Sequence, residues 1–204
     1  MEIELTRRAR KKEATKEKIF QAALKLFHAR GFDATTVDDI AAAADVAKGT
    51  FFNYFPRKEE LLAYISEQWY ERAQEQLESE LSGSNPPSID RITDIFVEAA
   101  AAYEEDRELS RHVIMEWMRR ESSGTDATCL QWRELGQHVL GELQKRGFIR
   151  RDVDIERAHQ VISSVHAGTM MQWVHAPKPP FRLPEELRRR IHLVIGGLGH
   201  RKGD

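Results

Sequence analysis

The chain has 204 residues, enough for one large domain or two small ones. Its 31 Lys and Arg nearly balance its 33 Asp and Glu, so a protein that is basic throughout is excluded. A single cysteine, Cys129, excludes an internal disulfide framework, and no apolar run approaches the roughly 20 residues of a membrane span. The charged N-terminus is not typical of a signal peptide. These features predict a cytoplasmic protein that has no membrane partner.

A basic run occupies residues 1–12, ahead of the first predicted helix. It contains Arg7, Arg8, Arg10, Lys11 and Lys12. Residues 1–60 carry 12 Lys and Arg against 10 Asp and Glu, a small basic excess at this end of the chain. Two interpretations remain open for the run. It is either a flexible arm that meets the phosphates or the minor groove of DNA, or a solvated and disordered terminus.

An apolar stripe predicts the first helix over residues 13–30. The stripe consists of Phe20, Ala23, Leu24 and Phe27, at the i, i+3, i+4, i+7 spacing of one helix face. Gly31 follows directly and suits the left-handed conformation that ends many helices. This helix would support the short helices that come next.

The stretch from Thr35 to Leu62 is the most informative part of the chain. Thr36, with Asp39 three residues later, has the spacing of a capping box and predicts the start of a short helix. Residues 44–47 would form a turn, and a second short helix over 47–54 would end before Pro56. Two such helices form a helix-turn-helix, whose second helix enters the major groove of DNA. An ordinary pair of packed helices has the same periodicity, so the period alone does not decide.

This stretch resembles the DNA-binding region of the TetR/AcrR family of bacterial transcriptional repressors. The agreement runs in register and without a gap. The matching residues are Gly31, Phe32, Thr35, Thr36, Val37, Ile40, Ala41, Ala44, Val46, Lys48, Gly49, Thr50, Phe51, Asn53, Tyr54, Phe55, Lys58, Glu59 and Leu61. Two positions depart from the family pattern. Phe52 stands where a tyrosine is usual, and Ala47 stands where a serine is common, so a phenol and a possible phosphate donor are missing.

The resemblance implies a three-helix DNA-binding domain over residues 13–60 and a helical regulatory and dimerisation domain over residues 61–204. It also implies which side chains contact DNA. The expected contacts are Thr36, Ala47, Lys48, Gly49, Thr50, Phe52, Asn53, Tyr54 and Lys58. Thr36, Tyr54 and Lys58 would hold phosphates, and the second short helix would lie nearest the bases. Phe52 could offer only an apolar contact, such as one to a thymine methyl group.

Beyond Pro56 the sequence predicts helices and no strand. The expected helices cover residues 58–80, 89–105, 107–121, 128–146, 155–175 and 184–198. A Gly- and Pro-rich segment at 82–88 separates the first two. Ser88 and Asp154 would cap helix starts, Gly147 would end a helix, and Pro184 suits a first helical position. The expected fold class is therefore all-α, with about nine helices in an N-terminal helix-turn-helix domain and a C-terminal helical domain.

The last two predicted helices carry long apolar stripes. In proteins of the family that this chain resembles, these helices pair with their copies across a twofold axis. The expected dimer contacts are Val161, Val165, Gly168, Leu187, Ile191, Val194 and Leu198. The alternative is that both stripes face the core of a single protomer.

Aromatic and methionine side chains are frequent on the middle helices. The candidates for a ligand site are Trp69, Tyr103, Trp117, Met118, Trp132 and Met170. Such side chains line adaptable apolar pockets, although they also fill ordinary cores. The resemblance favours a cavity for a small and mostly apolar effector, with His112, His138 and His166 as possible polar contacts. No metal-ligand spacing is present, so neither a metal nor a cofactor is expected.

These observations predict a ligand-responsive transcriptional regulator. It would be a repressor that binds palindromic operator DNA as a homodimer and leaves it when a small effector binds. The sequence has no phosphate-cradling loop, nucleophile elbow or His-Glu-x-x-His motif, so an enzyme is not expected. A regulator that needs no ligand, an activator and a helical adaptor without DNA binding remain alternatives.

Overall fold

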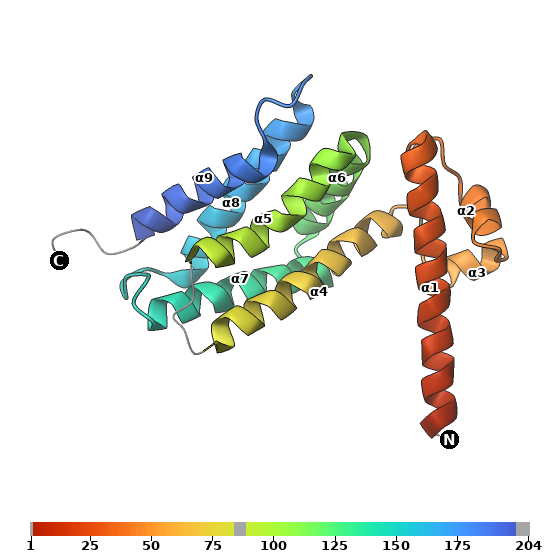
Figure 1. Ribbon diagram of the computed structural model, residues 1–204, viewed down its shortest axis with the longest axis horizontal. Coiled ribbons are helices and arrows are strands. Elements are labelled where there is room, and N and C mark those ends of the chain that lie inside the picture. Colours follow the sequence, from red (N-terminus) through yellow and green to blue (C-terminus); the bar gives the residue numbers. More distant parts are fainter. Residues whose placement is uncertain (1, 84–88, 199–204) are drawn as a thin grey trace. The chain divides into compact units, whose positions relative to one another are not determined.

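The computed structural model describes residues 2–83 and 89–198 of the chain. Within these ranges it contains helices and no strand (Figure 1). The helices are α1 (Glu2–Arg30), α2 (Val37–Ala43), α3 (Lys48–Phe52), α4 (Glu60–Ser82), α5 (Ile89–Glu105), α6 (Arg107–Ser123), α7 (Ala127–Lys145), α8 (Ile155–His175) and α9 (Leu183–Leu198). The expected all-α class is confirmed for this part of the chain. None of these helices is long and apolar enough to cross a bilayer.

The chain divides into two units, Met1–Ile65 and Ser66–Asp204. The N-terminal unit holds α1, α2, α3 and the start of α4. Its core consists of buried side chains from all four helices and from the segment between α3 and α4, among them Ile19, Phe27, Ile40, Phe51, Phe55 and Leu61. Aromatic contacts join the helices: the rings of Phe20 and Tyr64 lie 4.8 Å apart, and those of Phe55 and Tyr64 lie 5.8 Å apart.

Helix α1 is longer than the sequence predicted. It begins at Glu2 instead of near residue 13, so the basic run lies on a helix. The helical backbone differs from the flexible or disordered segment that was expected, while contact of the run with DNA stays a prediction. The physical reason is composition, because residues 2–30 contain no Gly or Pro and are rich in Ala, Glu, Lys and Arg, which favour helix. The side chains of Arg7, Arg8 and Arg10 are exposed.

The predicted helix ends around α2 are confirmed. Thr36 caps α2 in a capping box with Asp39, and Gly31 takes a φ of 83° just beyond α1. The turn into α3 contains a feature that the sequence did not predict. Asp45 has a φ of 49°, a left-handed conformation that short polar side chains tolerate better than most. Helix α3 is also shorter than expected, because Ala47 and Asn53 are its caps and lie outside it.

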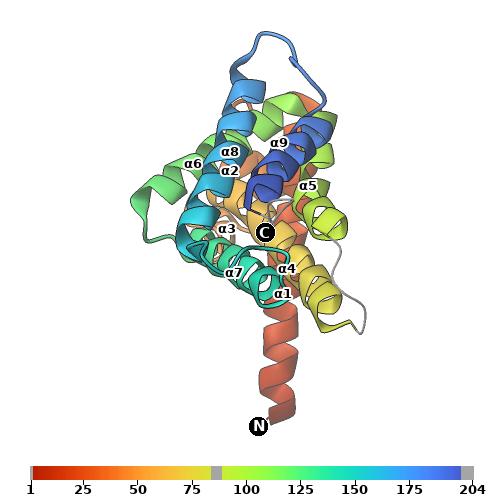
Figure 2. The same cartoon turned by 90° about the vertical axis from the view of Figure 1, so that its left-hand side faces the viewer.

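The C-terminal unit is built around α8, which packs against α6, α7 and α9, while α5 packs against α6 and α9 (Figure 2). Its core has two clusters of buried residues. One gathers around Leu77, Ile92, Leu143 and Ile149. The other gathers around Ile114, Met170, Trp173, Leu183 and Leu187.

Polar caps set several helix ends in this unit. Asp154 caps α8 and Gly147 has a φ of 84°, as predicted, while Ser88 lies outside the described residues. Asp106 and Asp126 cap α6 and α7, which the sequence analysis did not single out. Helix α9 begins at Leu183, so Pro184 is its second residue and not its first. Proline is tolerated throughout the first turn, where backbone N–H groups lack helical partners.

Candidate functional site

The exposed surface of α3 carries the residues that the sequence assigned to base contacts. Lys48, Gly49, Phe52 and Asn53 are exposed, whereas Phe51 is completely buried and anchors the helix to the core. Phe52 keeps 44% of its surface exposed, unusual for a phenylalanine beside a well-formed core. The structure therefore brings the predicted contact residues of α3 together on one outward surface. Their contact with DNA stays a prediction.

Ion pairs compensate the acidic residues next to this surface. The Lys48 ammonium lies 2.9 Å from Asp38 Oδ2, and Arg30 Nη2 lies 2.6 Å from Asp39 Oδ2. Hydrogen bonds from the hydroxyl and backbone N–H of Thr36, together with Arg30, hold the pKa of Asp39 below its ordinary value. A phosphate that approaches Lys48 would compete with the Asp38 carboxylate for the same ammonium group.

Lys58 has a role inside the N-terminal unit that the sequence did not reveal. Its Nζ donates hydrogen bonds to the carbonyl oxygens of Phe32 and Thr35, at 2.8 and 2.9 Å. The same ammonium lies 4.1 Å from the centre of the Phe32 ring. Lys58 thus ties the turn before α4 to the segment between α1 and α2. An ammonium group has three donors, so its expected phosphate contact stays a prediction that depends on the third N–H.

The C-terminal unit contains a cavity of about 200 Å³. Side chains from α4 to α9 line it, and five of the six predicted ligand-site residues are among them: Trp69, Tyr103, Trp117, Trp132 and Met170. Met118 is the exception, because it is partly buried against the core cluster that includes Ile114 and Met170. Of the three candidate histidines only His166 lines the cavity, while His138 is exposed on α7.

The cavity is mostly apolar, and two of its polar side chains, Tyr103 and His166, are uncharged. Edge-to-face contacts order its aromatic wall: the Trp69 and Tyr103 rings lie 4.7 Å apart, and the Trp117 and His166 rings lie 6.2 Å apart. Burial raises the pKa of Tyr103 and lowers the pKa of His166 to about 4. Both side chains are therefore neutral near pH 7, which suits a mostly apolar ligand.

The sequence analysis did not identify four polar side chains of the cavity lining. Glu121, Arg133, His159 and Ser163 all contribute to the lining. They come from α6, α7 and α8, so no local motif could have joined them. The one available signal was the spacing of His159, Ser163, His166 and Met170, which places all four on one face of α8.

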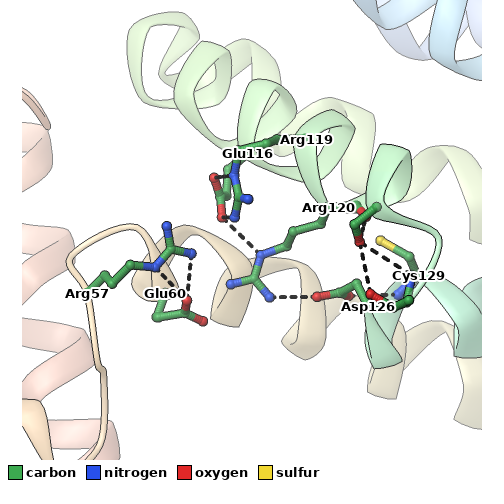
Figure 3. Close-up of polar contacts among 9 residues, drawn as sticks. Arg57, Glu60, Glu116, Arg119, Arg120, Asp126 and Cys129 are labelled. Carbon is green, nitrogen blue, oxygen red and sulfur yellow. Dashed lines mark hydrogen bonds and ion pairs between the residues drawn. The ribbon is translucent and has the colours of Figure 1, made fainter.

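An ion-pair network, in which Glu116 is buried and Arg119 is exposed, lies at the junction of α6 and α7 (Figure 3). Glu116 on α6 accepts hydrogen bonds from Arg119 and Arg120, and Arg120 Nη1 donates to Asp126 at 2.9 Å. Hydrogen bonds from Arg119 and then Arg120 lower the pKa of Glu116 to about 2. Burial raises the pKa of the Cys129 thiol to about 12, which leaves this cysteine neutral and chemically inert. The network is structural, since it fixes the start of α7 to the end of α6.

The structure corrects part of the expected dimer surface. Leu187 and Ile191 are buried in the core of the protomer, at 0% and 6% exposure, so they are not available to a second copy. Ile191 also lines the cavity. Val161 (51%) and Gly168 are exposed on α8, and Val194, Leu198 and Val165 are half-buried. The sequence analysis missed Leu193, whose 79% exposure on α9 is the largest among the described bulky apolar side chains.

An outward helix-turn-helix joined to a separate helical unit with an internal cavity defines a class of protein: transcription factors that bind DNA and a small ligand. Within the described residues, no group of His, Cys, Asp and Glu side chains is placed to hold a metal ion.

Comparison with known families agrees with this class. Residues 19–65 match the model of the bacterial regulatory proteins of the tetR family, and residues 67–197 match that of the C-terminal domain of TetR/AcrR family transcriptional repressors. The chain belongs to this family, and it is a ligand-responsive, DNA-binding transcriptional repressor.

Individual relatives cover nearly the whole chain. The repressor KstR of Rhodococcus jostii is 26% identical over 89% of this chain and 82% of its own. A crystal structure of Thermus thermophilus FadR, a TetR family transcriptional repressor in complex with lauroyl-CoA, has a TM-score of 0.74. It is 28% identical and covers 92% of this chain and 97% of that chain. The repressor SmeT of Stenotrophomonas maltophilia shares the fold, with a TM-score of 0.69, 22% identity and coverage of 94% of this chain and 93% of its own.

Proposed function

We propose that this protein binds a palindromic operator in the cytoplasm as a homodimer and leaves the operator when an apolar effector fills the cavity. The observation that carries the proposal is the joint presence of two separate sites in one chain. The N-terminal unit exposes Lys48 and Phe52 on α3 and Asn53 at its C-terminal cap, and the C-terminal unit contains an aromatic cavity. Enzymatic activity is not part of the proposal, because the relatives of this chain are transcriptional regulators.

Two copies of α3 would enter successive major grooves, about 34–36 Å apart. The exposed surface of α8 and α9 supports a twofold interface, with Val161, Gly168 and Leu193 in its centre. Gly168 has no neighbouring atom within 4 Å of where a Cβ would lie, so a second helix can approach its backbone closely. The N-terminal unit of each protomer would contact only one half of the palindromic operator, so operator affinity would depend on this interface.

Helix α4 supports a connection between the two sites. It is continuous from Glu60 to Ser82 and carries Tyr64, which contacts Phe20 and Phe55 in the N-terminal unit. The same helix carries Trp69, which lines the cavity. An effector can release DNA only if it binds the DNA-incompetent arrangement more tightly than the competent one. Operator DNA must then lower the effector's affinity by the same factor.

The test uses a labelled duplex from the intergenic DNA upstream of the protein's own gene. Fluorescence anisotropy should show salt-sensitive binding that unrelated DNA does not match. The lauroyl-CoA complex of the 28% identical FadR makes lauroyl-CoA a first candidate effector, and its addition should lower operator affinity. Equal affinity for both duplexes at every salt concentration would contradict the proposal.

A further inference from the structure

One part of the cavity lining differs in chemistry from the rest. Glu121 on α6 and Arg133 on α7 form an ion pair, with Arg133 Nη2 at 3.0 Å from Glu121 Oε1. Both side chains remain partly exposed, at 40% for Arg133 and 35% for Glu121. The pair therefore lies where the lining reaches the protein surface. His166, a partly buried polar side chain of the lining, has no charged partner of this kind.

Hydrogen-bond donors outnumber acceptors around this ion pair. A guanidinium has five N–H donors, and the described residues engage only Nη2 of Arg133, toward Glu121. His159 and Ser163 lie on the same stretch of the lining, with the ring Nε2 and the hydroxyl oxygen 3.3 Å apart. Burial, and then the charge of Arg133, lower the pKa of His159, so the imidazole is neutral and offers one N–H.

Gly136 on α7 makes room for the His159 ring. A Cβ at position 136 would lie 2.5 Å from Cδ2 and 2.6 Å from Nε2 of His159, closer than real Cβ contacts allow. Glycine thus lets the imidazole lie directly against the α7 backbone, one helical turn beyond Arg133. The imidazole and the guanidinium are held on the same side of the lining by this arrangement.

The remainder of the lining offers little to a charged group. Phe96, Val139, Leu140, Ile162 and Ile195 supply aliphatic and aromatic surface. Arg133 is the only permanently cationic side chain of the lining within the described residues, and Glu121 is the only permanently anionic one. A ligand that matches this distribution has one acceptor-rich polar end and an apolar body.

We propose that Arg133, His159 and Ser163 form a binding site for an anionic head group, so that the effector is an amphipathic acid whose apolar part fills the cavity. The acid would replace Glu121 as the partner of Arg133, and Glu121 would turn to solvent. A carboxylate or a phosphate matches the guanidinium fork, which binds such groups through two parallel hydrogen bonds. This inference rests on the proposed function, because it names the chemical class of the effector.

The test compares four probes with the same eight-carbon body: octanoate, octyl phosphate, the neutral octanamide and the cationic octylamine. Binding to the full-length protein without DNA is measured by isothermal titration and by fluorescence of Trp69, Trp117 and Trp132, which line the cavity. Because no DNA is present, a failure here is separate from a failure of operator binding. Octanoate or octyl phosphate should bind at least tenfold more tightly than octanamide and octylamine. Whichever of the two anions binds better identifies the head group as a carboxylate or a phosphate.

Variants then assign the preference to the residues. Arg133→Met keeps the apolar stem and removes the charge, so it should abolish the preference for the anion and leave octanamide binding within twofold. Glu121→Gln removes the competing carboxylate and should raise affinity for the anion. Arg111→Met is the matched control, because Arg111 is an exposed arginine of α6 outside the lining. Arg111→Met should leave the affinities for all four probes unchanged.

Three results would overturn the proposal. The first is equal binding of octanoate, octyl phosphate and octanamide to the unmodified protein, which needs no variant to fold. The second is a preference for octylamine, which would make Glu121 the recognition group. The third is a failure of every anionic probe to bind saturably. Circular dichroism of each variant confirms that a loss of binding is not a loss of fold.

Discussion

The ammonium of Lys58 should contribute substantially to the stability of the N-terminal unit. Lys58→Met keeps most of the side-chain stem and removes both hydrogen bonds to the carbonyls of Phe32 and Thr35. Hydrogen bonds that involve a charged group contribute about 1.5–3 kcal/mol each. The lower value applies here because the site is only part-buried, which gives about 3 kcal/mol for the two. This is a large fraction of the 5–15 kcal/mol typical of a domain.

Hydrogen exchange followed by mass spectrometry is the assay for this effect, because it reports opening of one unit separately from the other. Amides of α2 and of the segment 31–36 should exchange faster in Lys58→Met, whereas those of α8 should not change. Lys48→Met is the control, since its exposed pair with Asp38 contributes about 1 kcal/mol or less. The reasoning is refuted if Lys58→Met and Lys48→Met accelerate exchange equally.

The same variant separates the internal role of Lys58 from the expected phosphate contact. The slope of log affinity against log salt is negative, and losing one phosphate contact makes it shallower by about one. We expect this shallower slope in Lys58→Met, in addition to the faster exchange. Faster exchange with an unchanged slope would show that Lys58 acts only inside the protein.

Three further predictions concern the C-terminal unit and α3. Glu116→Gln should lower the free energy of unfolding at pH 7 by at most about 3 kcal/mol, because the pKa of Glu116 is near 2. This contribution is present above about pH 4.5 and is lost as the pH falls toward 2. Melting curves of the variant and the parent protein should therefore converge in acid. Val161→Glu and Leu193→Glu should weaken the dimer in sedimentation experiments without unfolding the protomer. Ile191→Ala should instead lower the free energy of unfolding by about 2–5 kcal/mol, because Ile191 is buried in the protomer core. A dimer that is unchanged in both Glu variants would argue against this interface. Phe52→Tyr restores the phenol that is usual in the family and should raise affinity for specific and unrelated duplexes alike, and a gain confined to one sequence would contradict a phosphate contact.

The misplaced apolar side chains of α6 and α9 share one cause. A helical stripe shows that one face is apolar, but it does not show which neighbour covers that face. Leu187 and Ile191 belong to the stripe of α9 that packs against α5 and α8 of the same protomer, while Leu193 lies on the open side. Met118 was misplaced for the same reason, because it has the chemistry of a cavity residue and the position of a core residue.

The sequence by itself determined the local features of this protein. The capping box at Thr36, the cap at Asp154 and the left-handed Gly31 and Gly147 depend on residues within a few positions of one another. The helix-turn-helix could also be predicted from the sequence, because its two helices and its turn are contiguous in the chain.

Only the tertiary structure decided which side chains from distant segments meet. Lys58 bonds carbonyls 23 and 26 residues earlier in the chain. The polar end of the cavity joins Glu121, Arg133 and His159 from three different helices. Their partners are set by the packing of whole helices, which depends on the complementary shapes of buried side chains and not on any spacing within one segment. The helix-turn-helix was therefore visible in the sequence, whereas the chemistry of the cavity lining emerged only when the helices were placed together.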